Sequence, residues 1–247
     1  MKTVIIAITT ILIATVAMAD GKAIPYTVDG DTYEGYYISP TANAPLVLLI
    51  HDWDGLTEYE IKRSKMLSDL GYAVFAADLF GAGVRPTKLE DKQKLTGELY
   101  KDRKKMRQLM MGALETAASL GADTSNAVAM GYCFGGTVVL ELARAGVELK
   151  GFVPFHGGLT TPEGQDYAGT EGKILVFHGT TDKYVTMSHF AELAMELEKH
   201  GIYHEMITYS GAPHAFTVFG SDRYREEPDR KSWKRFVQFL EETLKSE

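Results

Sequence analysis

The sequence Gly131-Tyr132-Cys133-Phe134-Gly135-Gly136 carries most of the information about the fold. An apolar run at residues 127–130 precedes it and predicts a buried strand, while residues 134–145 have the pattern of a helix. A G-x-C-x-G sequence between a strand and a helix is the nucleophile-elbow pattern G-x-S-x-G with cysteine in place of serine. Side chains two residues from the nucleophile would collide with the neighbouring strand and helix, so glycine occupies both positions. The pattern predicts an exposed sulfur at the start of a helix, whose dipole favours negative charge.

An acid and a base follow the elbow in the chain. Asp182 comes after the predicted strand at residues 174–177, and His214 lies in a turn-rich loop after the last predicted strand. From such a loop the imidazole reaches the sulfur as a general base, and the carboxylate orients the imidazole. The order nucleophile, acid, base is that of the α/β-hydrolases. The alternatives are a buried free cysteine at Cys133 and, for Asp182, a cap for the helix that begins near Thr186.

The order of the predicted elements indicates an α/β fold. Continuous apolar runs predict buried strands at residues 46–50, 72–77, 127–130 and 174–177. Two weaker strand candidates lie at residues 151–155 and 203–208. Helical patterns occupy residues 57–70, 88–120 (with a break near Gly97), 134–145, 186–200 and 229–244. Residues 24–28 and 32–39 flank Asp29-Gly30, a strong hairpin signal. We therefore expect one domain over residues 20–247 with the α/β-hydrolase fold: a mostly parallel central sheet, an antiparallel N-terminal hairpin and helices on both faces.

The composition excludes several classes of protein. The chain has 247 residues, 45% of them hydrophobic, and a formal net charge of −7, which argues against a nucleic-acid binder held mainly by charge. Its single cysteine cannot form an intrachain disulfide or a thiol-rich zinc site. His200 and His204 are four residues apart, but Gly201 ends the helix between them, so no metal site is expected. We expect an enzyme without a cofactor that acts on a small molecule as a monomer or homodimer.

Residues 1–19 have the pattern of a secretory signal peptide. Lys2 supplies the positive start, an apolar run covers residues 4–17, and the small residues Ala17 and Ala19 lie at positions −3 and −1. The alternative is an uncleaved anchor helix, which needs about 20 consecutive apolar residues, more than this run provides. We therefore expect cleavage after Ala19, export to the periplasm or beyond, and no membrane attachment after cleavage.

Several segments together resemble the dienelactone hydrolase family of α/β-hydrolases. They are the elbow sequence at residues 131–136, Phe177-His178-Gly179 leading to Asp182, residues 209–216, and Ala77-Asp78-Leu79-Phe80-Gly81. The similarity spans residues 36–240, nearly the whole chain after the signal segment. The resemblance implies a catalytic triad of Cys133, His214 and Asp182. It also implies an oxyanion hole formed by the backbone N–H groups of Phe134 and Trp53.

The chain departs from this family at positions that hold the substrate. Dienelactone-cleaving members have a glutamate in the oxyanion loop that takes part in activating the thiol, where this chain has the shorter Asp52. They also use two arginines to bind the substrate carboxylate, and the matching positions here are Ala82 and Val218. Arg85 and Arg223 lie nearby in the sequence but would need loop rearrangements to replace them. A bidentate carboxylate clamp is therefore not expected, which weakens the case for dienelactone as the substrate.

Aromatic and polar residues beside these motifs are candidates for the substrate pocket, and core packing is the alternative for each. In addition to the triad and the oxyanion hole, they are His51, Asp52, Tyr132, Phe155, His156, Tyr184 and Phe216. The basic run at residues 101–107 is interpreted as the solvated face of an amphipathic helix, or as part of a lid.

The favoured function is hydrolysis of a small ester or lactone through a thioester on Cys133. Amides are poor substrates for a thiolate, because sulfur leaves the tetrahedral intermediate more readily than an amine does. An acyltransferase or a thioesterase-type enzyme would use the same site. A binding protein that keeps the fold without turnover is the alternative outside enzymology.

Overall fold

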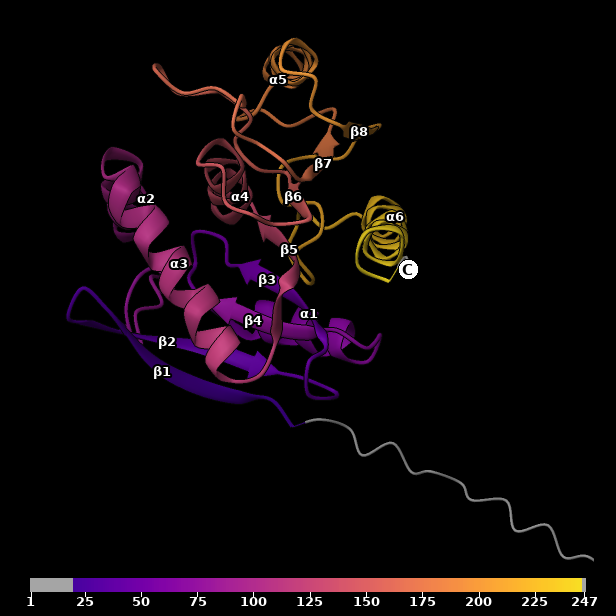
Figure 1. The fold of residues 1–247 in the computed structure, drawn as a ribbon. Helices are drawn as coiled ribbons and strands as arrows, with labels where there is room; N and C mark the ends of the chain where they lie inside the picture. Colours follow the sequence, from indigo (N-terminus) through magenta and orange to yellow (C-terminus); the bar gives the residue numbers. More distant parts are fainter. Residues whose placement is uncertain (1–19, 246–247) are drawn as a thin grey trace, which may run out of the picture.

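A computed structural model describes residues 20–245 of the chain, and the predicted signal segment at residues 1–19 lies outside the described residues. The described chain forms an eight-stranded sheet with the strand order β1-β2-β4-β3-β5-β6-β7-β8 (Figure 1). β1 (Lys22–Val28) and β2 (Asp31–Ile38) form the antiparallel hairpin expected around Asp29-Gly30. β2 then pairs antiparallel with β4 (Ala73–Ala77), which joins the hairpin to the rest of the sheet.

The remaining neighbours in the sheet run parallel to one another. They are β4 with β3 (Pro45–Ile50), and then β5 (Asp123–Tyr132), β6 (Gly151–Phe155), β7 (Lys173–Gly179) and β8 (His204–Tyr209). The predicted α/β-hydrolase fold class, with a mostly parallel sheet and an antiparallel N-terminal hairpin, is confirmed. Both of the weaker strand candidates are strands of this sheet.

Helices connect or flank the strands, and the predicted break within residues 88–120 is misplaced. They are α1 (Glu58–Ser68), α2 (Leu89–Lys101), α3 (Arg103–Ser119), α4 (Phe134–Arg144), α5 (Met187–Lys199) and α6 (Glu226–Leu244). Gly97 lies inside α2, and the break falls at Asp102, where φ is −113° and ψ is 74°. The Asp102 carboxylate accepts a hydrogen bond of 2.9 Å from the Lys105 N–H and so caps α3. The cap, rather than the low helix propensity of glycine, therefore decides where the helix is interrupted.

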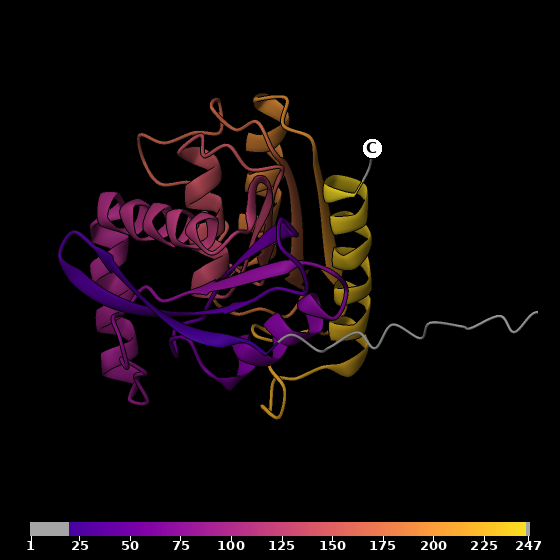
Figure 2. The ribbon, with the colours of Figure 1, turned by 60° about the horizontal axis from the view of Figure 1, so that its bottom comes forward.

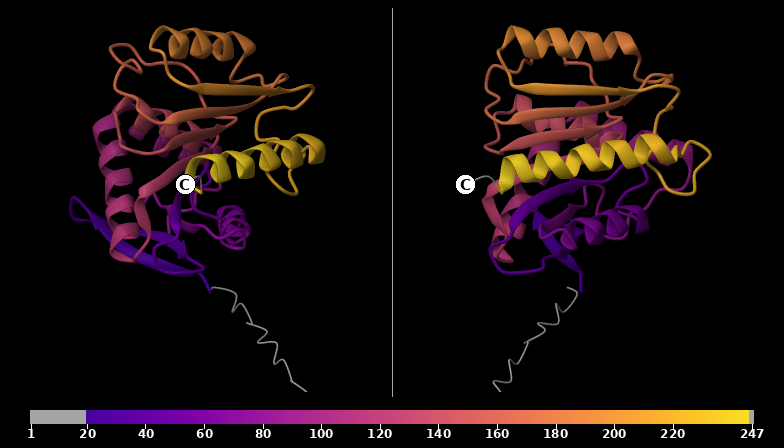
Figure 3. Two further views of the ribbon diagram at one scale, coloured as in Figure 1. Left: turned by 45° about the vertical axis from the view of Figure 1, so that its right-hand side comes forward. Right: turned by 90° about the vertical axis from the view of Figure 1, so that its right-hand side faces the viewer.

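The sheet separates two hydrophobic cores, which explains why its central strands are apolar throughout. Along β3, Leu46, Leu48 and Ile50 pack on one face with α3, α4 and α5, and Val47 and Leu49 pack on the other face with α1 and α6. Figure 2 shows α6 on one side of the molecule and α2 and α3 on the other, and Figure 3 shows α6 running alongside the strands β7 and β8. No helix within residues 20–245 is both long enough and apolar enough to cross a membrane.

The basic run at residues 101–107 is not simply a solvated face. Arg103 and Arg107 hydrogen bond to the carboxylate of Glu141, which is fully buried on α4 and also pairs with Arg144 at 3.0 Å. The lysines of the run, in contrast, are exposed. The cluster ties α3 to α4. The sequence did not reveal it, because Glu141 lies 34 residues beyond Arg107.

Candidate active site

The elbow between β5 and α4 has the geometry that its glycines predict. Cys133 has φ of 51° and ψ of −111°, a conformation that side chains rarely adopt, and α4 begins at the next residue. A Cβ atom on Gly131 or Gly135 would lie closer than 3.0 Å to backbone atoms, those of Gly135 and of Ile50 respectively. The two glycines are therefore required by the close approach of β5, α4 and the end of β3.

A hydrogen-bonded row of three side chains crosses this edge of the sheet. Nε2 of His214 lies 3.0 Å from Sγ of Cys133, and Nδ1 of His214 lies 2.7 Å from Oδ2 of Asp182. The other carboxylate oxygen of Asp182 accepts hydrogen bonds from the N–H groups of Tyr184 and Val185, at 2.9 and 3.0 Å. The Asp182 side chain thus fixes its own loop and His214, and it does not cap α5, whose N-cap residue is Thr186.

The electrostatics of this row favour a charged imidazole. Burial alone would lower the pKa of His214, but the hydrogen bonds to Asp182 and Cys133 outweigh it and raise this pKa to about 10. Burial would raise the pKa of Asp182, yet its hydrogen bond to His214 holds it below its ordinary value. An imidazolium beside a carboxylate and a sulfur is the arrangement that stabilises a thiolate nucleophile.

Two residues of the cavity around the sulfur have backbone N–H groups without an acceptor in the described part of the chain. Trp53, in the loop after β3, and Phe134, at the first turn of α4, both line the same cavity as Cys133. Within residues 20–245, neither of their N–H groups donates to a backbone or side-chain acceptor of the protein. Unpaired N–H groups next to a nucleophile suit the negative oxygen that develops when a carbonyl is attacked.

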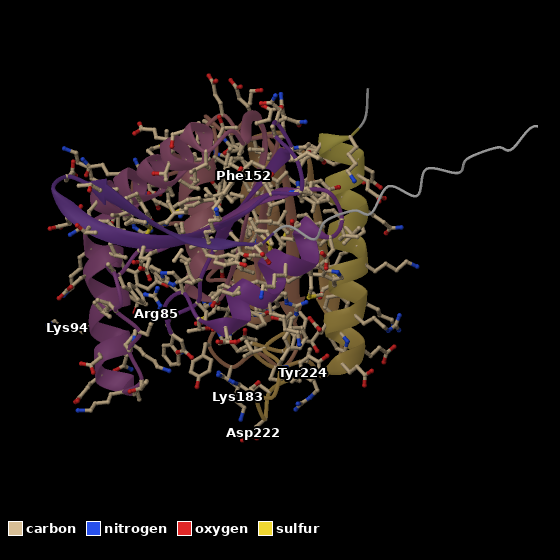
Figure 4. The ribbon with its side chains drawn as sticks, turned by 90° about the horizontal axis from the view of Figure 1, so that it is seen from below. Arg85, Lys94, Phe152, Lys183, Asp222 and Tyr224 are labelled. Atoms are coloured by element: carbon tan, nitrogen blue, oxygen red, sulfur yellow. The ribbon has the colours of Figure 1, made fainter. Side chains whose placement is uncertain are left out.

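The cavity over the sulfur is small and largely apolar, with a volume of about 230 Å³. It is lined by Asp52, Trp53, Tyr100, Cys133, Phe134, Thr137, Gly158, Tyr184, Val185, His214, Ala215 and Arg223. Figure 4 shows Lys183, Asp222 and Tyr224, the sequence neighbours of Tyr184 and Arg223, at one end of the molecule. Ligand pockets are commonly about 300–1,000 Å³, so this cavity suits a small substrate.

Two side chains of opposite charge give the cavity wall its polarity. Asp52 is almost completely buried, and its Oδ1 accepts a hydrogen bond of 2.7 Å from the N–H of Asp54. Burial and the charge of Asp54 raise the pKa of Asp52 to about 6, while Lys92 and Arg223 act in the opposite direction. Arg223 reaches the cavity without any rearrangement, contrary to the expectation from its place in the sequence. Turns between residues 215 and 225 fold the loop back, and the Arg225 N–H donates to the Phe216 carbonyl at 2.9 Å.

Arg85 does not compensate for the missing clamp. Its guanidinium donates hydrogen bonds to the carbonyls of Leu56 and Val84 and lies 3.7 Å from the Asp78 carboxylate. It is not part of the cavity wall. A substrate in this cavity would therefore meet one arginine, not two.

Five of the candidate pocket residues do not line the cavity: His51, Tyr132, Phe155, His156 and Phe216. Tyr132, Phe155 and Phe216 are buried in the core on the α1 and α6 face. They follow or end strands as expected, but their side chains point into the packed layer, where burying aromatic surface is favourable. Of the remaining candidates, Asp52 lines the cavity, and Tyr184 does so while staying 74% exposed.

His51 holds the loop after β3 in place through hydrogen bonds from the side away from the cavity. Its Nδ1–H donates to the Asp52 carbonyl at 2.6 Å, and its Nε2 accepts from the Leu79 N–H at 3.1 Å. Burial lowers the pKa of His51 to about 4, which keeps the ring neutral. The ring therefore links the ends of β3 and β4, and its role is structural.

Sequence reasoning missed several residues of the cavity wall: Tyr100, Thr137, Gly158, Val185 and Ala215. Thr137, Val185 and Ala215 lie within four residues of a triad member, so proximity in the sequence could have indicated them. Tyr100 belongs to the end of α2, and its ring packs edge-on against Phe134 in the cavity wall. Within residues 20–245, no group of three His, Cys, Asp or Glu side chains is placed to hold a metal ion.

The strand order, the elbow after β5 and the contact between Cys133 and His214 define an α/β-hydrolase. Comparison with known proteins places the chain more narrowly: it belongs to the dienelactone hydrolase family, whose family model matches residues 33–244. The chain is therefore a hydrolase of this family.

Relatives of known sequence or structure match nearly the whole chain. The protein named "Protein usf" of Aquifex pyrophilus is 25% identical, over 91% of this chain and 99% of its own length. The solved structure entitled m3DLH is 28% identical with a TM-score of 0.86, covering 92% of this chain and 100% of that one. A dienelactone hydrolase-like promiscuous phosphotriesterase from metagenomic libraries is 26% identical with a TM-score of 0.85, covering 92% and 99%.

Proposed function

We propose that this protein hydrolyses small esters or lactones with Cys133 as the nucleophile, His214 as the acid and base, and Asp182 as the group that orients His214. The observation that carries the proposal is the row Cys133–His214–Asp182, with contacts of 3.0 and 2.7 Å. The elbow conformation of Cys133 and the raised pKa of His214 support it. Membership of a hydrolase family supports the reaction type.

The first half of the reaction forms a thioester. The Cys133 thiolate attacks the carbonyl carbon, and the carbonyl electrons move to the oxygen, which the N–H groups of Trp53 and Phe134 stabilise. When the carbonyl re-forms, the bond to the leaving oxygen breaks. The departing alkoxide takes the proton of the His214 imidazolium and leaves as an alcohol, while the acyl group stays on sulfur.

The second half regenerates the enzyme. Neutral His214 removes a proton from water, and the hydroxide attacks the thioester carbonyl. Collapse of this second tetrahedral intermediate breaks the carbon–sulfur bond and restores the thiolate beside the imidazolium. The acid product then loses its proton to solvent, so atoms and charges balance over the cycle. Asp182 stabilises the charged imidazole throughout.

The cavity suggests which esters are preferred. Its small volume and the aromatic groups of Trp53, Tyr100 and Phe134 suit short acyl chains and compact lactones. Arg223 offers one site for an anionic group on the substrate. A phosphotriester is a useful further member of a substrate panel, because a structural relative of 26% identity is described as a promiscuous phosphotriesterase.

Replacement of the nucleophile tests this function. We expect Cys133→Ala to abolish hydrolysis of p-nitrophenyl acetate while the circular dichroism spectrum and the melting temperature stay close to those of the parent protein. Hydrolysis that persists in Cys133→Ala would contradict the assignment. Because Cys133 is the only cysteine of the sequence, no other thiol could replace it.

We also propose that the enzyme is exported after removal of residues 1–19. The proposal rests on the positive start, the apolar run and the alanines at positions −3 and −1. Expression with the full leader, followed by N-terminal sequencing of the exported protein, tests it. A sequence that begins at Asp20 is expected, and retention of Met1 would contradict export by cleavage.

A further inference from the structure

A second connection joins the elbow to the loop that carries His214. The backbone N–H of Cys133 donates to Nδ1 of His156 at 3.2 Å, in addition to its sheet-type bond of 3.0 Å to the Phe155 carbonyl. Nε2 of His156 lies 2.9 Å from Oγ1 of Thr217. Thr217 is three residues beyond His214 in the same loop. His156 therefore contacts both the nucleophile's backbone and the base loop.

The hydrogen bonds fix which ring nitrogen of His156 carries the proton. Because Nδ1 accepts from the Cys133 N–H, the proton must reside on Nε2, which then donates to Thr217. Burial, reinforced by the nearby His214, holds the pKa of His156 well below its ordinary value. The ring is neutral, and it lies edge-on to His214 with 5.4 Å between the ring centres.

Thr217 is held from the other side as well. Its Oγ1 lies 2.8 Å from the hydroxyl of Tyr59, and its carbonyl accepts a hydrogen bond of 3.1 Å from Arg63. Tyr59 and Arg63 belong to α1, and the buried Arg63 also pairs with Asp229 of α6. Thr217 is fully buried, so each polar atom of its side chain and carbonyl depends on these partners.

We propose that the His156–Thr217 hydrogen bond positions the catalytic base, so that it sets the separation between the His214 imidazole and the Cys133 sulfur. This inference rests on the proposed function of Cys133 and His214. Only Ala215 and Phe216 separate His214 from Thr217, and Phe216 is fully buried, so a shift of Thr217 is passed on to His214. His156 and Thr217 are positioning residues, because neither lines the cavity.

The test compares a substitution that removes the Thr217 hydroxyl with one that keeps it. Thr217→Val keeps the shape and loses the hydroxyl, while Thr217→Ser keeps it. Thr170→Val is the matched control, because Thr170 is also buried and donates one hydrogen bond of 2.8 Å, to the Ala143 carbonyl, away from the cavity wall. The measurements are kcat and KM for p-nitrophenyl acetate, and the rate at which iodoacetamide alkylates Cys133 across a pH range.

We expect Thr217→Val to lower kcat roughly tenfold with little change in KM, because a misplacement of about 1 Å in a catalytic group can cost about 10²-fold in rate. The alkylation profile should shift in the same variant, since His214 no longer supports the thiolate at its former distance. Thr217→Ser should stay within about twofold of the parent protein, because it keeps the hydroxyl as a hydrogen-bond partner. A purely structural role would lower the melting temperature without moving the alkylation profile.

A second substitution tests the same bond from the other partner. In His156→Asn the amide oxygen replaces Nδ1 as acceptor for Cys133, and asparagine tolerates the φ of 41°, but the side chain is too short to reach Thr217. Because Thr217→Val also removes the contact with the Tyr59 hydroxyl, we expect His156→Asn to lose no more activity than Thr217→Val, and the double variant to be no worse than Thr217→Val alone. Additive losses, or a Thr217→Val variant that matches Thr170→Val in both kcat and alkylation, would overturn the inference. Full activity in Cys133→Ala would instead overturn the proposed function itself.

Discussion

The imidazole of His214 lies 3.0 Å from the sulfur of Cys133, although 81 residues separate the two in the sequence. β8, which leads to His214, is three strands away from β5, which leads to Cys133. The loop after β8 must therefore cross the carboxyl ends of β7 and β6. It is held at β7 by the hydrogen bond from the Thr181 N–H to the Ala212 carbonyl, and at β6 by the bond between His156 and Thr217.

The raised pKa of His214 gives a prediction about pH. Its ordinary value is 6.5, and the folded value is about 10, so the folded protein should keep the imidazolium between these two values, where an unfolded chain would lose it. This contribution to stability is complete below pH 6.5 and is lost as the pH rises toward 10. Nuclear magnetic resonance titration of the His214 ring measures the midpoint. We expect it to fall in Asp182→Asn, and an unchanged midpoint would contradict the role of the carboxylate.

A pair of glycine substitutions tests the elbow. In Gly135→Ala the new methyl group would meet the Ile50 and His51 carbonyls closer than 3.0 Å, so we expect a loss of about 1–3 kcal/mol in the free energy of unfolding, together with a loss of activity. Gly97→Ala is the matched control, because beyond the neighbouring helix backbone no atom lies within 4 Å of the added methyl group on α2. It should stabilise the protein by about 0.5–1 kcal/mol, since alanine favours a helix. Equal melting temperatures for the two variants would contradict the close packing at the elbow.

The buried cluster around Glu141 gives a prediction about stability. Glu141→Gln would leave Arg103, Arg107 and Arg144 without their shared negative charge. The side chain of Arg144 is buried, so its charge would have no counter-charge in the interior. We expect a cost of about 3–5 kcal/mol in chemical denaturation, because removing one partner of a buried ion pair strands the others. Glu115→Gln, at an exposed position of α3, should change stability by less than about 0.5 kcal/mol. A similar effect of both substitutions would show that the cluster adds little.

Arg223 gives a prediction about substrate choice. If its guanidinium receives an anionic group, Arg223→Gln should lower kcat/KM for an ester that carries a free carboxylate by roughly tenfold or more, since a charge-assisted hydrogen bond contributes about 1.5–3 kcal/mol. The loss for the neutral methyl ester of the same acid should be much smaller. Arg223→Lys is the matched variant, because it keeps the charge and loses the planar fork. Equal losses for the two esters would argue against a role in recognising the anion.

The elbow and the order of strands and helices were predictable from the sequence because they depend on local pattern. A side chain at Gly131 would collide with the backbone of Gly135, only four residues further on, so this requirement is visible in a short stretch of sequence. The apolar run of β3 directly reflects burial on both faces of the sheet. The break between α2 and α3 was misplaced at Gly97, because the stronger signal was the cap formed by Asp102. A cap depends on side-chain geometry that residue type alone does not specify.

The wall of the cavity was less predictable, since it depends on how loops fold back. Arg223 reaches the site through turns after Ala215, and Tyr100 reaches it from the end of α2, where its ring packs edge-on against Phe134 with 5.5 Å between the ring centres. His156 and Phe216 both come after strands, at the edge of the sheet formed by the carboxyl ends of the strands. Their side chains are nevertheless buried beside the cavity and do not line it. Position at the carboxyl end of a strand therefore identifies the neighbourhood of a residue and not the direction of its side chain.

Direct detection of an acyl-enzyme is the most informative measurement. The protein would be mixed with p-nitrophenyl acetate, quenched with acid within the first turnovers, digested, and examined by mass spectrometry. We predict an acetyl group on Cys133, formed in the parent protein, accumulating in a variant of His214 that cannot activate water, and absent from Cys133→Ala. An acetyl group on another residue, or hydrolysis of the ester by Cys133→Ala, would contradict a reaction through a thioester on this sulfur.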